Sequence, residues 1–575
     1  MSEEKVEIKV ESDKFLHFFK KYYSFILLIT LIFISFFYQL YLITLSPYSY
    51  GVDGAYYDLN VSSILETGQM WSNDNPFSFY YFTLWSVILS NITLGIKVGI
   101  VSFCAFIPLP IYLIIKKFSQ NEMAALFGAF VSIFNPLLFR MMGDFVKNAM
   151  SVFFLLFFIY FFIITCEKKY PIKKTILFYG ISLSLFILIV LTHIYATGFA
   201  IGFVFIYFMY SIIHTVITER KFPWTETKLV LFLGISGGLT FVIGYLLNPD
   251  YFYHFSKFID FISGLFDAIF PSYETSTLAL EQTQYAPDLL LNPIEFFVLG
   301  IISIVGVSII VYDLIKKRKN PPIFQFLGFA LIVYFPTYLI IPNLHQLMFN
   351  IPPALLMDIL NFLTTIPVAA GIALVCFEIY KNDPKMNILN RIKGNLLSIF
   401  LMCILLALPI ISMEWRTRFV LLNFIPLSVF IGYPLKKLNI GRRKVAAFAF
   451  IGFFATSMII QTNYFCYYSF RSYLRPEGEE DLLFLKNYVE NNSTLTGSKI
   501  IVANMEFFYF TILITGLDVG YPGNPSEIAR QYNETVFVVI ENIRQFISVP
   551  SGQEVIRNET NGQFIIILAN YTYHD

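Results

Sequence analysis

The chain has 575 residues, of which 57% are hydrophobic and only 14% carry a charge, and its mean hydropathy is +0.65. Because an average soluble domain has about 25% charged residues, this composition excludes an ordinary soluble protein and indicates an integral membrane protein. Lys and Arg (40) nearly balance Asp and Glu (39), so no net basic field points to nucleic acid as a partner. The five cysteines are scattered without paired or metal-binding spacing, which argues against a disulfide framework and structural zinc.

The polar residues 1–21 precede an apolar run at 22–45 that is too long for a cleavable signal and lacks a small-residue cleavage site. This run is therefore predicted to remain as a transmembrane helix. A hydrocarbon core of about 30 Å requires about 20 apolar residues per helix, and this length predicts about thirteen spans along the chain. They are 22–45, 96–115, 121–139, 149–166, 174–193, 194–213, 228–247, 293–312, 322–342, 354–379, 395–413, 418–435 and 445–464.

The orientation follows from the basic residues of the short loops, which concentrate on the cytoplasmic side of membrane proteins. With the N-terminus inside, the predicted inner loops hold most of the Lys and Arg residues, at 116–117, 168–174, 220–228, 316–319, 381–393 and 436–444. We therefore expect a cytoplasmic segment 1–21, a transmembrane domain 22–469 with a first outer loop at 46–95, and an extracytoplasmic tail at 470–575.

The first outer loop has no Lys or Arg before Lys97 but contains four acidic residues, the first of which is Asp53. Asp53 lies a few residues beyond the first span and precedes a predicted short helix that ends before Gly68, a common helix-stop residue. It either caps this helix or is a functional acid at the membrane surface, and we favour the second interpretation because interfacial acids are commonly functional. Tyr56 and Tyr57 are candidates for substrate contacts. The apolar segment 76–94 is predicted to be a helix lying at the membrane interface.

A second group of polar residues fills the predicted short outer turn between the third and fourth spans. Asp144, Lys147 and Asn148 have the spacing i, i+3 and i+4, which predicts one shared helix face. Asp144 either caps the fourth span with Lys147 as its ion-pair partner, or it is a second functional acid facing Asp53. In the second interpretation Arg140 and Lys147 contact a phosphate and Asn148 contacts the substrate.

Further candidates lie in other predicted outer turns. Arg416 and Arg418 break the positive-inside trend, and Arg suits bidentate phosphate binding; the alternative is snorkelling to lipid headgroups. His193, at the junction of the fifth and sixth spans, and His345 are candidates for substrate contacts, although a lone His is more often a satisfied polar residue.

The tail is predicted to be a small α/β unit. Residues 478–491 have a helical pattern, and the β-branched runs 499–502, 536–540 and 564–568 are typical of strands.

Two of these segments carry a resemblance to a known family. The context Asp53-Gly-Ala-Tyr-Tyr, followed by Ile-Leu-Glu-Thr-Gly, resembles the GT-C superfamily of polytopic membrane glycosyltransferases, and the turn Gly143-Asp144-Phe-Val-Lys147-Asn148 is similar to the second acidic motif of its prokaryotic members. The superfamily includes protein O-mannosyltransferases, aminoarabinose transferases and oligosaccharyltransferase catalytic subunits. The tryptophans at 71, 85, 224 and 415 are unpaired, so the Trp-Trp-Asp acceptor motif of oligosaccharyltransferases is absent. This absence argues against en bloc N-glycan transfer.

The resemblance implies a GT-C-like helical membrane fold and a hexosyltransferase that uses a polyprenyl (dolichyl)-phosphate sugar. It assigns the catalytic base to Asp53 and a supporting role to Asp144. No cofactor is required by the sequence, and a divalent metal, if used, would bind Asp53 and Asp144. The implied partners are the lipid-linked sugar, a protein, lipid or glycan acceptor, and membrane lipids.

The chemistry is consistent without the family. A polyprenyl-phosphate sugar carries its own leaving group, so one carboxylate base that deprotonates the acceptor hydroxyl is enough, with inversion at the sugar carbon. Cations stabilise the departing phosphate. The candidates for this role are Arg140, Lys147, Arg416 and Arg418.

Two other functions remain open at this point. A transporter or flippase of a lipid-linked substrate should have charged or broken spans at the membrane midplane, whereas the acids of this chain collect in outer loops. A polymer ligase would also use outer Arg and His residues, and would be favoured if Asp53 were dispensable while His345 and the arginines were essential.

Overall fold

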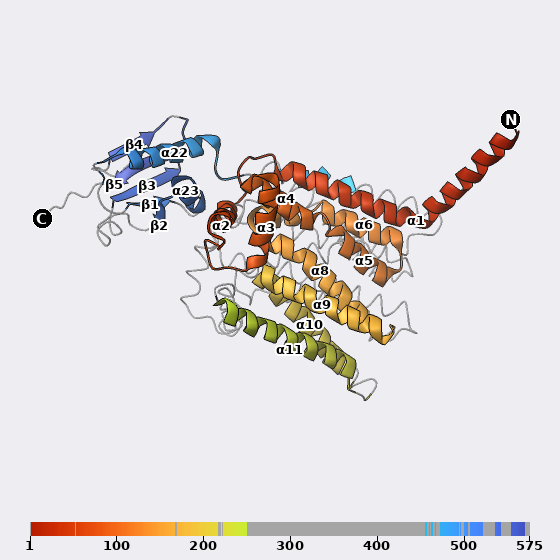
Figure 1. Cartoon of the computed structure of the whole chain (residues 1–575). Helices are drawn as coiled ribbons and strands as arrows, with labels where there is room; N and C mark the ends of the chain where they lie inside the picture. Colours follow the sequence, from red (N-terminus) through yellow and green to blue (C-terminus); the bar gives the residue numbers. More distant parts are fainter. Residues whose placement is uncertain are drawn as a thin grey trace, which may run out of the picture.

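A computed structural model describes residues 2–249, a few residues between 455 and 466, and residues 472–569. Within these ranges it leaves out residues 52, 167–169, 215, 217–219, 221, 494, 496–498, 504–506, 521–534, 542–553 and 560. The described residues form a helical region and a C-terminal region with a β-sheet, and the two lie side by side at the end where α2 is found (Figure 1). The predicted spans between 293 and 435 lie outside the described residues.

Five helical segments of the described part are long and apolar enough to cross a membrane. They are Tyr22–Ile43, Ile92–Lys117, Val146–Cys166, Ile172–Thr192 and Glu226–Leu247. The first belongs to α1 (Ser2–Ile43), which continues from the polar N-terminal residues without a break. The chain is thus a multi-pass membrane protein, as its composition indicated, and the predicted total of thirteen spans stays a prediction.

Prolines divide two of the predicted spans. The segment Ile92–Lys117 consists of α4 (Ile92–Cys104) and α5 (Pro108–Ser119), with Pro108 in the first turn of α5. The prediction of one helix over 121–139 was wrong, because α6 (Glu122–Ile133) ends before Pro136, where α7 (Pro136–Asp144) begins. Proline lacks the N–H group needed inside a helix but is well tolerated in the first turn.

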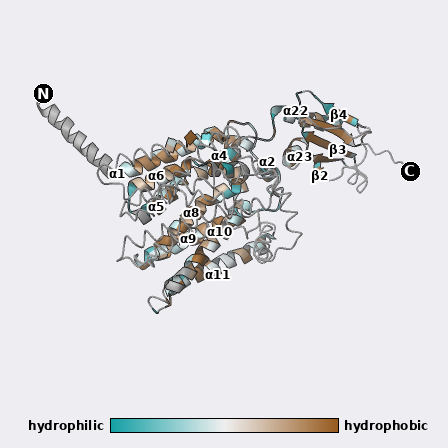
Figure 2. Ribbon diagram, turned by 180° about the vertical axis from the view of Figure 1, so that it is seen from behind, coloured by the Kyte–Doolittle hydropathy of each residue, from teal (hydrophilic) through white to brown (hydrophobic). Residues whose placement is uncertain are grey.

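The next four helices agree with predicted spans to within a few residues. They are α8 (Val146–Cys166), α9 (Ile172–Thr192), α10 (Ile194–His214) and α11 (Trp224–Leu247). Helix α8 is mostly buried, whereas α9 and α11, which are also largely apolar (Figure 2), bury few of their residues. Few buried residues are expected of helices that face lipid. Helix α8 therefore holds its side chains inside the protein.

The first loop folds into two short helices, α2 (Gly54–Thr67) and α3 (Pro76–Leu89). Helix α2 ends as predicted at Gly68, whose φ of +78° is in the left-handed region that favours glycine. The segment predicted as one helix at 76–94 is α3 followed by a tight turn and the start of α4. At this turn a side chain on Gly95 would lie 2.5 Å from the Ser86 Cα, so α3 and α4 meet through a glycine.

The C-terminal region is a mixed five-stranded sheet with strand order β2-β1-β3-β5-β4. Strand β1 (Lys499–Ala503) pairs in parallel with β2 (Asp518–Gly520) and β3 (Thr535–Glu541), while β5 (Phe564–Ala569) is antiparallel to β3 and β4 (Glu554–Asn558). The three predicted strands are confirmed to within one residue, and α22 (Pro476–Asn491) confirms the predicted helix. The sequence analysis missed β2, β4 and α23 (Phe508–Thr515).

The C-terminal region packs directly on the first loop. Ala55 of α2 is fully buried in the same apolar cluster as Phe507, Phe510 and residues of the sheet. Close by, the Tyr48 hydroxyl donates a hydrogen bond of 2.5 Å to the Glu479 carboxylate of α22. The C-terminal region and the Asp53 loop therefore lie on the same side of the helical region.

Candidate active site

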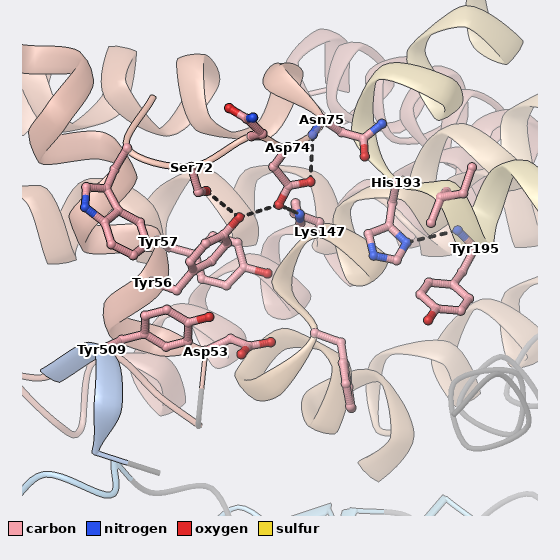
Figure 3. Close-up of a pocket in the computed structure, with 14 residues that line it drawn as sticks. Asp53, Tyr56, Tyr57, Ser72, Asp74, Asn75, Lys147, His193, Tyr195 and Tyr509 are labelled. Atoms are coloured by element: carbon pink, nitrogen blue, oxygen red, sulfur yellow. Dashed lines mark hydrogen bonds and ion pairs between the residues drawn. The ribbon is translucent and has the colours of Figure 1, made fainter. Parts of the chain in front are cut away.

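A pocket of about 670 Å³ opens where the first loop, the start of α8, the junction of α9 and α10, and helix α23 meet (Figure 3). Four separate segments of the chain contribute its walls. The lining residues are Asp53, Tyr56, Tyr57, Trp71, Ser72, Asn73, Asp74, Asn75, Phe145, Lys147, His193, Ile194, Tyr195 and Tyr509.

Asp53 occupies the N-cap position of α2 but does not cap it. Its backbone has φ −85° and ψ 2°, outside the extended conformation usual at this position, and its side chain makes no capping hydrogen bond. The carboxylate instead lines the pocket. Between the two interpretations of Asp53, this geometry argues against the cap.

The neighbouring acid, Asp74, is tightly held by other groups. Its carboxylate is 1% exposed and accepts hydrogen bonds of 2.6 Å from the Tyr56 hydroxyl and from the Asn75 backbone N–H. It also forms an ion pair with the Lys147 ammonium group. A carboxylate that already accepts several hydrogen bonds and an ion pair has a structural role in the pocket wall.

Lys147 brings a buried positive charge into the pocket from the second residue of α8. Its ammonium group lies 5.2 Å from the ring centroid of Phe79 and 5.8 Å from that of Tyr56. The predicted helix face shared by Asp144, Lys147 and Asn148 was wrong: α7 ends at Asp144 and α8 begins at Val146, and the spacing rule holds only within one helix. Within the described side chains, Lys147 forms an ion pair with Asp74 of the first loop.

The Tyr56 hydroxyl connects Asp74, the partner of Lys147, to Ser72 of the pocket lining. Besides its bond to Asp74, its hydroxyl accepts a hydrogen bond of 2.8 Å from the Ser72 hydroxyl. Burial, reinforced by the adjacent Asp74 carboxylate, raises the pKa of Tyr56 well above its ordinary value. Tyr56 therefore remains a neutral donor that fixes Asp74 in place.

His193 ends α9, where the sequence analysis placed the junction of two spans. Its Nδ1 accepts a hydrogen bond of 3.3 Å from the Tyr195 backbone N–H, and the two rings stack with centroids 5.1 Å apart. This contact orients the imidazole ring of His193 at the wall of the pocket.

A buried acid of α2, Asp58, fixes the segment that leads to Asp53. Asp58, 4% exposed, accepts hydrogen bonds from the Ser49 hydroxyl and, at 3.1 Å, from the Thr93 hydroxyl, while Lys97 donates to the Ser46 carbonyl at 2.5 Å. Burial raises the pKa of Asp58 to about 6, although the two hydroxyls and nearby Lys97 oppose this shift. These bonds tie residues 46–49 to α2 and α4.

The pocket brings together five of the residues singled out by the sequence. Asp53, Tyr56, Tyr57, Lys147 and His193 all line it. The other candidates within the described residues do not: Arg140 is half-buried on α7, and Asn148 is buried on α8. Asp144 is the last residue of α7. Arg416, Arg418 and His345 lie outside the described residues.

Sequence reasoning missed Asp74 and Tyr509 as members of this pocket. The first loop has no basic residue before Lys97, so an acid buried in it needs a cation from another loop. The sequence pointed to the turn that carries Lys147 as a source of that cation. It did not indicate that Asp74 is the acid with which Lys147 pairs. Tyr509 had no comparable signal, because nothing in the sequence predicts that α23 packs on α2.

The described residues offer no group of three or more His, Cys, Asp or Glu side chains that could hold a metal ion. The predicted metal site at Asp53 and Asp144 stays a prediction, because the described side chains do not include that of Asp144.

The fold of the chain is also found among known structures. The chain is similar to the archaeal oligosaccharyltransferase AglB from Archaeoglobus fulgidus in complex with an inhibitory peptide and a dolichol-phosphate. The two are 14% identical with a TM-score of 0.56, over 91% of this chain and 70% of AglB.

A weaker likeness, with 11% identity and a TM-score of 0.40, links it to ArnT from Cupriavidus metallidurans bound to undecaprenyl phosphate, over 95% of this chain and 98% of that one. No family model and no curated protein sequence matches the chain.

Proposed function

We propose that this protein is a glycosyltransferase that moves a sugar, a hexose in the first instance, from a polyprenyl (dolichyl)-phosphate to a protein, lipid or glycan acceptor at the outer face of the membrane. The observation that carries the proposal is the pocket in which Asp53, not used as a helix cap, lies with the buried cation Lys147. The GT-C-like fold supports it, because the similar structure of AglB contains a dolichol-phosphate.

The proposed reaction is a direct displacement. Asp53 accepts the proton of the acceptor hydroxyl while the hydroxyl oxygen attacks the anomeric carbon of the sugar. The bond between this carbon and the phosphate oxygen breaks, and polyprenyl phosphate leaves. The configuration at the anomeric carbon is inverted in the product. The leaving phosphate needs no protonation by the protein. Asp53 is assigned this role because its carboxylate lines the pocket without capping α2. Asp74, bonded to Tyr56, Asn75 and Lys147, is assigned a structural role.

Lys147 is proposed to stabilise the phosphate as negative charge develops on it. An ammonium group has three N–H donors, so its bond to Asp74 does not exhaust its capacity to bind a phosphate oxygen. Arg416 and Arg418 are proposed to contribute further positive charge, Asp144 to support Asp53, and His193 and His345 to contact the substrate. Arg140 and Asn148 lie outside the pocket lining and are given no direct contact with the substrate.

The proposal is tested with the full chain in lipid nanodiscs and dolichyl-phosphate hexoses that are radiolabelled in the sugar. With source membranes added as acceptor, we expect label to leave the lipid and to appear in a protein, lipid or glycan, with one dolichyl phosphate formed for each sugar transferred. If label stays on the lipid while the lipid crosses the bilayer of sealed vesicles, the protein is a transporter and the proposal is wrong.

The outer location of the pocket is a separate expectation that rests on the basic inner loops. In a cysteine-free background, Gln69→Cys of the first loop and Glu480→Cys of α22 should both react with a membrane-impermeant thiol reagent in intact cells, since both positions are exposed. Lys173→Cys, exposed at the opposite end of α9 from His193, should react only after permeabilisation. Labelling of the Lys173 position alone in intact cells would reverse the proposed topology.

A further inference from the structure

Among the described residues of the C-terminal region, Tyr509 on α23 lines the pocket. Its ring lies 5.2 Å from the ring of Tyr56 and 6.3 Å from that of Trp71, measured between centroids. The contact with Trp71 is edge-to-face, with an interplanar angle of 87°. Two aromatic residues from regions far apart in the sequence thus meet at one end of the pocket, on the same side as Asp53 (Figure 3).

Trp71 differs from the other aromatic residues of this cluster in its exposure. It is 45% exposed, whereas Tyr57, which lines the same pocket, is 3% exposed. Burying an indole ring is among the larger apolar gains available to a protein. Because Trp71 both lines the pocket and remains partly exposed, its ring is accessible to a ligand in the pocket.

The chemistry of this corner fits a pyranose ring. The face of an aromatic ring carries partial negative charge, and the C–H groups on one face of a pyranose carry partial positive charge, so the two stack. Sugar hydroxyls need polar partners at the edge of such a platform, and Ser72 and Asn73 line the pocket beside Trp71. A lipid chain, in contrast, would have to displace water from these polar groups without replacing their hydrogen bonds.

We propose that Trp71 and Tyr509 form a pyranose-binding subsite next to the Asp53 base. The bound sugar is either the hexose of the donor or a sugar of a glycan acceptor. The assignment to donor or acceptor rests on the proposed glycosyltransferase function. The binding of a pyranose ring by Trp71 and Tyr509 does not depend on that function. Because Tyr509 belongs to α23, the subsite is complete only when the C-terminal region is packed on α2.

The test measures binding by the full chain in nanodiscs to three probes: dolichyl phosphate, dolichyl-phosphate glucose and dolichyl-phosphate mannose. Methyl hexopyranosides are examined in parallel by saturation-transfer NMR. The variants are Trp71→Leu and Tyr509→Leu, which keep an apolar side chain but lose the aromatic face, and Tyr509→Phe, which keeps it. Matched controls are Trp224→Leu, at an exposed position on α11, and Tyr473→Leu, at an exposed position of the C-terminal region.

For a subsite that binds the donor sugar, both Leu variants should raise the Kd of a dolichyl-phosphate hexose about tenfold and leave the Kd of dolichyl phosphate within about twofold. For a subsite that binds an acceptor glycan, all three lipids should bind as before and the NMR signal of the methyl glycosides should disappear. In both cases Tyr509→Phe and the two controls should behave like the wild-type protein, and the melting temperatures should be unchanged.

The proposal is overturned if the wild-type protein binds the dolichyl-phosphate hexoses no better than dolichyl phosphate and also fails to bind the methyl glycosides. It is also overturned if the Leu variants weaken dolichyl phosphate as much as its hexose derivatives. Loss of sugar binding in these variants of a protein that transfers no sugar would reject the proposed function but retain the subsite.

Discussion

Replacing Asp53 by Asn is expected to abolish sugar transfer while the protein folds and binds its lipid donor. Asn has the shape of Asp but cannot accept a proton, and a positioned general base contributes about 10²- to 10⁴-fold to the rate. The structure adds a reason to expect normal stability, because the Asp53 side chain makes no capping hydrogen bond to α2 that Asn would have to replace.

The measurement is the initial rate of transfer from a dolichyl-phosphate hexose, together with the Kd of the donor and the melting temperature. Glu66→Gln is the matched control, because Glu66 is an exposed acid near the other end of the same helix, with Ser62 as its hydrogen-bond partner. It should leave all three quantities unchanged. Transfer by Asp53→Asn at close to the wild-type rate would show that another group is the base.

Breaking the ion pair between Asp74 and Lys147 is expected to give the largest loss of stability of any single charge removal in the pocket. The two side chains are 1% and 9% exposed, and removing one partner of a buried pair typically costs about 3–5 kcal/mol because the other charge is left buried. Asp74→Asn and Lys147→Met should each lower the free energy of unfolding by this order, and the double variant should lose less than the sum.

The control is the pair Lys116–Glu122, whose charged atoms lie 2.8 Å apart but whose side chains are 43% and 35% exposed. Exposed pairs contribute about 0–1 kcal/mol, so Glu122→Gln should have a small effect. Unfolding in detergent by chemical denaturant, combined into a double-variant cycle, gives the coupling energy of each pair. Equal effects at the two pairs would contradict the burial that the structure assigns to Asp74 and Lys147.

Local patterns in the sequence predicted the parts of the fold that depend on local physics. Gly68 marks the end of α2 because only a residue at ease with positive φ stops a helix in this way, and three strands follow from runs of β-branched residues. The break at Pro136 was missed because hydropathy continues across it, although proline chemistry allows no continuous helix there.

The site was predicted only in part, for a physical reason that Lys147 illustrates. The sequence showed that the first loop lacks a cation and that the turn near Lys147 has one, but four acids of the loop were available as partners. The choice among them depends on which acid is buried, and burial arises from contacts between residues 73 positions apart. Tyr509 depends on an even more distant contact, between the C-terminal region and α2.

The packing of α23 against α2 also determines how this protein can be divided or recombined. The C-terminal region supplies Tyr509 to the pocket, and the interface that holds this region includes the fully buried Ala55 and the bond from Tyr48 to Glu479. A shortened chain without residues 472–569 would open the cavity to bulk water and uncover apolar surface on α2. The sheet is therefore not an interchangeable module, and chimaeras between distant homologues must inherit it together with the first loop from the same parent.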